Sequence, residues 1–173
     1  MEHFSDSSDK YIAGEIRNSN ADAFKALYFR YYESLYRFLL IRTGSQETSR
    51  DFVQDVFAGL WQNRRSIRTE KSLRAYLFRI ANNLVIDHSR RQKTQHLYSE
   101  RFFDFEMSEN PELRRRIFSA IEELPEKLRT VFVLSRFDGL RYAEIAEACD
   151  ISIKTVEKRM SVALRILRKE LGG

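Results

Sequence analysis

The sequence predicts an all-α fold of two small helical domains joined by a flexible linker. Only two prolines and six glycines occur in 173 residues, so few positions would break a helix. Almost no stretch alternates apolar and polar residues with the period of a strand, whereas apolar residues recur every three or four positions along most of the chain. Thirteen phenylalanines and eight tyrosines are enough to fill compact cores. A chain of this length allows two small domains.

Three apolar stripes predict the helices of the first domain, to which we assign residues 20–93. Residues 1–19 are assigned to an N-terminal extension. Trp61 closes the second stripe and is expected to be a buried anchor, because aromatic side chains mainly supply buried area. The stripes span 24–39, 52–61 and 73–85.

The helical stripe is lost after this domain. Acids and aromatics mix in the following stretch, which ends at Pro111. We therefore expect a linker over residues 94–112.

Residues 113–173 form the second predicted domain. Its apolar stripes predict four helices, and Pro125 separates the first two. The last two have the spacing of a helix-turn-helix. The apolar positions of the first two helices lie within 113–124 and 128–134, and those of the helix-turn-helix lie at 145–146 and within 156–167.

The turn of this motif has recognisable parts. Ile145 and Ala146 give the helix before it an inward face, and Ser152 can cap the helix after it by accepting a free N–H of the first turn. Such turns often have glycine where the backbone becomes left-handed. This chain has Asp150 there, and aspartate tolerates that conformation better than most other residues.

The helix after the turn is basic on its outward side. Lysine and arginine suit guanine edges or phosphates, and threonine suits a phosphate or a thymine methyl group. A recognition helix presents such residues to the major groove. The residues expected to meet DNA are Ser152, Ile153, Lys154, Thr155, Lys158 and Arg159. The alternative is an ordinary helical hairpin with a solvated basic face.

Charge and composition narrow the classes of function. A net charge of +5 and a pI near 9.4 favour a polyanionic partner. No apolar run approaches the roughly 18 residues that span a bilayer, and residues 1–10 have no export core, so we expect a cytoplasmic protein without membrane insertion. Cys149 is the only cysteine, and the sequence has no metal-ligand spacing or glycine-rich phosphate loop. We therefore expect no metal, no cofactor and no enzymatic activity.

The order of these motifs resembles that of the extracytoplasmic-function sigma factors, the small two-domain type of bacterial transcription initiation factor. The motifs are residues 51–61, 72–91, 121–125 and the terminal helix-turn-helix. The resemblance implies that the first domain binds core RNA polymerase and opens the minus-ten element of promoter DNA. It implies that the second domain recognises the minus-thirty-five element. Family members are commonly held inactive by a membrane-linked anti-sigma factor, so we expect such a partner.

One side of the predicted helix 51–61 carries acids and amides around a small residue. Such a surface suits a basic helix of a partner, and in the resembled family this helix binds a coiled coil of the largest polymerase subunit. The residues assigned to polymerase binding are Asp51, Gln54, Asp55, Ala58 and Gln62. A solvated helix face and a catalytic or metal-binding acidic pair remain alternatives, although no third ligand accompanies the pair.

The segment 72–93 combines amides with cations. Amide side chains can read a base that has left the stack, and cations hold the flanking phosphates. By resemblance, Asn83 lies near the pocket that captures a flipped base. Phe78 lies off the apolar stripe, so it either packs under a neighbouring helix or offers a stacking surface. The residues assigned to minus-ten DNA are Arg79, Asn82, Asn83, Arg90, Arg91 and Lys93.

Two other functions compete with that of a sigma factor. A stand-alone helix-turn-helix regulator would need a sensory first half, and neither β/α alternation nor a ligand-type domain is apparent. A nucleic-acid-processing enzyme would need a carboxylate or histidine cluster, or a phosphate loop, and neither is apparent. We therefore expect a sigma factor.

Overall fold

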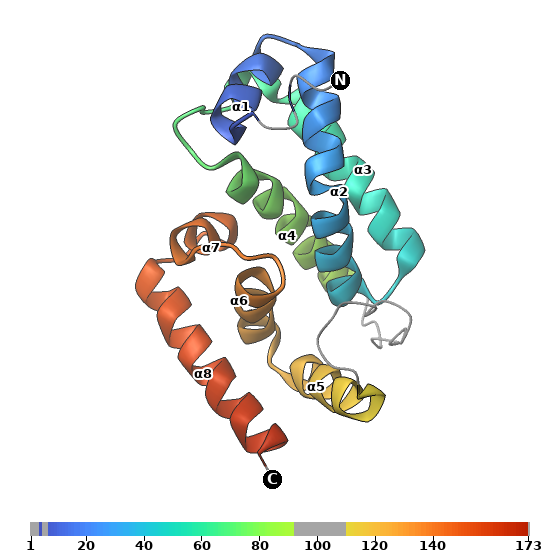
Figure 1. The fold of residues 1–173 in the computed structure, drawn as a ribbon, viewed down its shortest axis with the longest axis vertical. Helices are drawn as coiled ribbons and strands as arrows, with labels where there is room; N and C mark the ends of the chain where they lie inside the picture. Colours follow the sequence, from blue (N-terminus) through green and yellow to red (C-terminus); the bar gives the residue numbers. More distant parts are fainter. Residues whose placement is uncertain (1–3, 5–6, 92–109, 173) are drawn as a thin grey trace. The chain divides into compact units, whose positions relative to one another are not determined.

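The computed structural model describes residues 4, 7–91 and 110–172, and all regular structure in these residues is helical (Figure 1). The all-α prediction is confirmed. Two compact units are present. Helices α1 to α4 build the core of the first unit, and α5, α6 and α8 build the core of the second. Helix α7 lies between α6 and α8 in the sequence. The elements are α1 (Asp9–Arg17), α2 (Ala21–Thr43), α3 (Gln46–Gln62), the 3-10 helix η2 (Arg64–Ser66), α4 (Leu73–Arg91), α5 (Pro111–Glu123), α6 (Glu126–Arg136), α7 (Tyr142–Cys149) and α8 (Ile153–Leu171).

The N-terminal segment that the sequence left as an extension contains α1. Oγ of Ser8 accepts from the N–H of Tyr11 (3.3 Å) and caps the helix. Ile12, Ala13 and Ile16 are buried, so α1 is part of the packed first unit. The apolar pattern did not predict this helix because only these three core positions occur in its nine residues.

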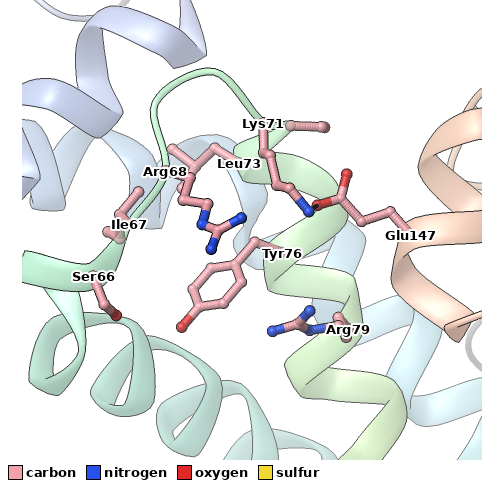
Figure 2. Close-up of a pocket in the computed structure, with 9 residues that line it drawn as sticks. Ser66, Ile67, Arg68, Lys71, Leu73, Tyr76, Arg79 and Glu147 are labelled. Atoms are coloured by element: carbon pink, nitrogen blue, oxygen red, sulfur yellow. Dashed lines mark ion pairs between the residues drawn. The ribbon is translucent and has the colours of Figure 1, made fainter.

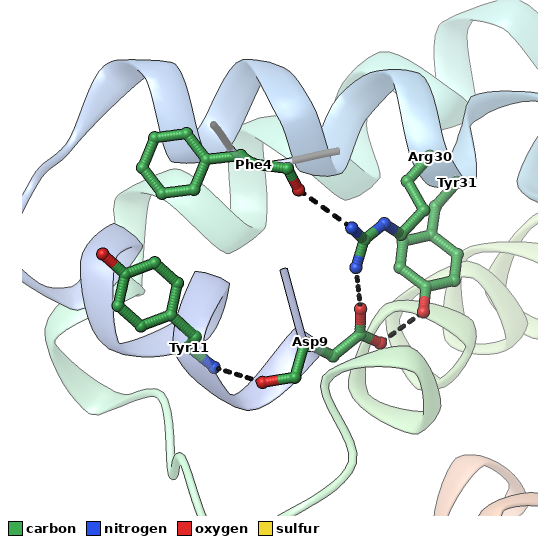
Figure 3. A network of polar contacts seen from close by, with 6 residues as sticks. Phe4, Asp9, Tyr11, Arg30 and Tyr31 are labelled. Atoms are coloured by element: carbon green, nitrogen blue, oxygen red, sulfur yellow. Dashed lines mark hydrogen bonds and ion pairs between the residues drawn. The ribbon is translucent and has the colours of Figure 1, made fainter. Parts of the chain in front are cut away.

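A polar network ties α1 to α2 (Figure 3). The guanidinium of Arg30 pairs with Asp9 (2.7 Å) and also donates to the carbonyl of Phe4 (3.0 Å). The hydroxyl of Tyr31 donates to the second carboxylate oxygen of Asp9. Burial, and next this hydrogen bond, raise the pKa of Tyr31 well above its ordinary value of 10.0. The network therefore favours the neutral phenol.

Aromatic side chains fill the core where α2 meets α3 and α4. Phe24 contacts Trp61 with ring centroids 4.9 Å apart, and Phe38 meets Phe78 edge to face at 5.4 Å. Phe78 is completely buried, so it packs in the core and does not offer a stacking surface. Trp61 is only half-buried, and the guanidinium of Arg64 lies over its ring, 4.6 Å from the centroid.

The second unit begins earlier than the linker prediction implied. Pro111 is helical, since its fixed φ suits the first turn and its missing N–H has no helical partner there. Asn110 caps α5 by accepting from the N–H groups of Glu112 (2.9 Å) and Leu113 (3.3 Å). Residues 94–109 of the predicted linker lie outside the described part of the chain.

The turn between α7 and α8 has the geometry that its sequence indicated. Asp150 ends α7 with φ 53° and ψ 51°, which is the left-handed conformation. Oγ of Ser152 accepts from the N–H of Thr155 (3.1 Å) and caps α8. Ile145 and Ala146 are buried, as the pattern predicted. Together these contacts fix where α8 begins.

Candidate functional site

The five residues assigned to polymerase binding lie together on an exposed face of α3. Their positions repeat at three and four residues, which places them on one side of a helix. The opposite side of α3 is buried in the first unit through Val53, Val56 and Leu60. None of the five makes a side-chain hydrogen bond or ion pair with another described residue. The exposed residues, which we call the α3 face, are Asp51, Gln54, Asp55, Ala58 and Gln62.

A second face lies on α4. Tyr76, Arg79 and Asn83 follow at spacings of three and four, and the side chains of Arg79 and Asn83 are exposed. The guanidinium of Arg79 lies 5.5 Å from the centroid of the Tyr76 ring. Figure 2 shows Ser66 and Arg68, from the segment before α4, beside this ring; these residues line the same pocket as Tyr76 and Arg79. We call Tyr76, Arg79 and Asn83 the α4 face.

The structure changes part of the minus-ten assignment. Asn82 is buried, with 6% of its surface exposed, because it lies on the same side of α4 as Phe78 and Val85. The assignment of Asn82 to minus-ten DNA needs an exposed side chain, so this part of the prediction is wrong. The side chains of Arg90 and Arg91, and all of Lys93, lie outside the described residues.

Tyr76 is the member of the α4 face that the sequence analysis missed. It was counted in the apolar stripe, but its ring is only half-buried and borders the pocket of Figure 2. The available signal was its spacing from Arg79 and Asn83, at three and seven residues. An aromatic ring, a cation and an amide are the groups that bind single-stranded nucleic acid by stacking, charge and hydrogen bonding.

The third face is formed by the first turns of α8. Ile153 is 47% exposed, and Lys154 and Lys158 are also exposed. Arg159 is half-buried and lies on the flank of the helix, so it is less open to a partner than the two lysines. Glu157, which the sequence analysis did not assign to DNA binding, is also exposed and lies between Lys154 and Lys158 in the sequence. We call Ile153, Lys154, Glu157 and Lys158 the α8 face.

Two hydroxyl groups from the same prediction serve the helix itself. Ser152 accepts the capping N–H, and its Oγ lies 2.9 Å from the hydroxyl oxygen of Thr155, so the two side chains share a hydrogen bond. A contact from either hydroxyl to DNA would compete with this bond. Their first role is to position the α8 face.

The described residues contain neither a metal-ligand cluster nor a membrane-spanning helix. No group of three or more histidine, cysteine, aspartate or glutamate side chains among them could hold a metal ion. Within the same residues, no helix is long and apolar enough to cross a membrane.

Two family models match the chain in sequence order. Residues 27–95 match Sigma-70 region 2, which includes α3 and α4, and residues 114–167 match Sigma-70 region 4, which includes α7 and most of α8. The three faces therefore lie within the two matched regions.

Relatives and solved structures match over nearly the full length. ECF RNA polymerase sigma factor SigW of Bacillus subtilis is 29% identical, over 91% of this chain and 93% of its own. The ECF RNA polymerase sigma-E factor of Haemophilus influenzae is 28% identical, over 95% of each. The structure of CnrH in complex with the cytosolic domain of CnrY superimposes with a TM-score of 0.77 at 25% identity, covering 96% of this chain and 98% of that one. The sigma factor RpoE of Bartonella quintana, in complex with the anti-sigma factor NepR, has the same fold (TM-score 0.70, 20% identity, 86% and 96% coverage).

Proposed function

The chain belongs to the extracytoplasmic-function sigma factors, which direct promoter-specific transcription by core RNA polymerase, and we propose that its three exposed faces divide this work. The α3 face binds the polymerase, the α4 face holds an unpaired promoter base, and the α8 face reads duplex DNA. The observation that carries the proposal is that each of the three faces presents exposed polar or charged side chains within the two regions shared with the family.

The α3 face suits a basic helical partner. Asp51 and Asp55 lie one turn apart, with Ala58 continuing the same side, so a helix could approach closely between acid and amide groups. The face is not needed for internal pairing, since none of its side chains bonds to another described residue. A surface with these properties is available to a partner without loss of packing.

The α4 face suits a base that has left the stack of the minus-ten element. The Tyr76 ring offers a stacking surface, and the cation of Arg79 beside it can hold a phosphate. The exposed amide of Asn83 can donate to and accept from a base edge. We expect Arg90, Arg91 and Lys93 to extend this cationic surface along the strand.

The α8 face suits the major groove of the minus-thirty-five element. Its side chains come from the first two turns of α8, which are the turns that a recognition helix presents to base edges. Lys154 and Lys158 are exposed cations for guanine edges or phosphates. Arg159 lies at the side of this face, where a phosphate contact fits better than a base contact.

We also expect an inhibitory partner. The Bartonella quintana sigma factor was solved in complex with an anti-sigma factor. Because this chain belongs to the same family, we expect that it too binds an anti-sigma factor. Such a partner could cover either unit, and a linkage of this partner to the membrane is part of the same expectation.

The division between base capture and duplex reading can be tested with one pair of promoters. Holoenzyme would be assembled from core polymerase and the full chain, and binding and opening measured on a duplex promoter and on the same promoter with a pre-melted, non-complementary bubble. Asn83→Ala should impair opening of the duplex promoter more than it impairs initial binding to that promoter. Its defect should shrink on the bubble, because the cost of unpairing is already met, and should depend on one base of the bubble.

Lys158→Ala should instead weaken binding to both promoters equally, whatever the base in the bubble. Asn18→Ala, which removes an exposed amide at the end of α1, is the matched control and should change neither step. If Asn83→Ala has no base-dependent defect on either promoter, the α4 face does not hold a flipped base.

A further inference from the structure

The α8 face contains one acidic side chain among its cations. Glu157 is exposed, one turn after Ile153 and three residues after Lys154. Within the described part of the chain, it forms no ion pair with either neighbouring lysine. Its carboxylate is therefore available to an outside donor.

The carboxylate lies near the end of α8 that would enter the groove. Side chains on a helix lean towards its N-terminus, so Glu157 covers the turn that begins with Ile153 and Lys154. A negative charge there repels the phosphates of DNA and weakens binding to every sequence alike. The charge favours binding only where a base presents a donor to it.

The major groove offers few such donors. Guanine presents only acceptors at its groove edge, and thymine presents an acceptor and a methyl group. Cytosine presents its N4 amino group, which is the usual partner of glutamate, and adenine presents N6 beside an acceptor. A carboxylate in this position therefore discriminates most strongly against guanine and thymine.

We propose that Glu157 is a specificity-determining residue that reads a cytosine in the minus-thirty-five element through the N4 amino group. The inference rests on the proposed placement of the α8 face in the major groove. Lys154 and Lys158 supply the attraction to phosphates and guanine, while Glu157 rejects sequences that lack an amino group at one position. The charge costs affinity for other sequences and so increases selectivity.

The test is selection of promoters from a library randomised over the upstream element, with holoenzyme made from core polymerase and the full chain. The wild-type protein should enrich cytosine at one position of one strand. Glu157→Ala should lose about tenfold discrimination there, within the range of a base-specific hydrogen bond, and should bind non-selected sequences more tightly. Glu157→Gln should shift the same position towards adenine, because glutamine bonds to adenine N6 and N7.

Glu170→Ala is the matched control. It removes the same charge from the same helix, about 20 Å further along the axis, and should leave every base preference unchanged. If Glu157→Ala strengthens binding to all duplexes by one common factor and keeps the cytosine, Glu157 only repels phosphates and the inference is wrong. If wild-type holoenzyme enriches no base in the upstream element, the proposed role of the α8 face fails, and this inference fails with it.

Discussion

Charge reversal on the α3 face separates binding from folding. In Asp51→Lys/Asp55→Lys, both changes fall on exposed positions in the middle of α3, away from its first and last turns. Neither aspartate has an internal partner among the described residues, so the free energy of unfolding should change by no more than about 0.5 kcal/mol. The helix keeps its buried side, which the two changes do not touch.

The effect on polymerase binding should be much larger. Reversal removes two attractive contacts with a basic partner and replaces each with a like-charge contact, which costs more than simple loss. We expect a weakening of core-polymerase binding by about 100-fold at moderate salt, with the difference shrinking as salt rises.

The assay is titration of labelled protein with core polymerase, together with urea unfolding followed by circular dichroism. Glu33→Lys/Glu70→Lys is the control, because both glutamates are exposed in the first unit but neither lies on α3. Each substitution changes the charge by two, so both double variants change it by four. Equal weakening by both variants would show a general charge effect, and a large loss of stability with normal binding would show that the α3 face is structural.

Three further predictions concern stability, each measured by urea unfolding. Asp150→Gly should be more stable than Asp150→Ala by about 1 kcal/mol, because only glycine takes the left-handed conformation without a steric cost; equal stabilities would refute this. Because the pKa of Tyr31 is raised in the folded state, its neutral phenol contributes to stability. This contribution is fully present below pH 10.0, where the phenol of the unfolded chain is also protonated, and it is lost as the pH rises further. Tyr31→Phe should therefore lose less stability than wild type above pH 10.0, and parallel curves would contradict the assignment. Ser152→Ala should cost about 1 kcal/mol through loss of the cap while Ser152→Asp retains it, and no difference between the two would argue against capping.

Local rules were sufficient for the helix-turn-helix. The left-handed turn at Asp150 and the cap at Ser152 depend on residues only a few positions apart, so the sequence contains the whole cause. The same holds for the three long helices of the first unit, whose apolar spacing spans several turns. Helix α1 was not predicted, because its contacts are with residues distant in the sequence: it is buried against other helices, and Asp9 bonds to residues of α2.

Side-chain orientation on α4 could not be predicted as well. Successive residues turn by about 100°, and the apolar set of this helix is broad, so its boundary is uncertain by one residue. The sequence analysis therefore assigned both Asn82 and Asn83 to minus-ten DNA, although only Asn83 is exposed, and it counted Tyr76 in the apolar stripe although its ring borders a pocket. Glu157 was missed for a different reason. A DNA-binding face is predicted from cations, and an acidic residue can be assigned to such a face only when its side chain is known to be exposed there.

Transcription reconstituted from purified parts tests the central claim most directly. Core polymerase and this chain alone would be incubated with genomic DNA of the source organism, and the 5′ ends of the RNA sequenced. We predict starts that require the chain and that share two upstream sequence elements, the nearer one opened and the farther one bound as duplex. If the added chain produced no starts beyond those of core polymerase, or acted only when another sigma factor was present, the account would be contradicted, and a stand-alone regulator would explain the protein better.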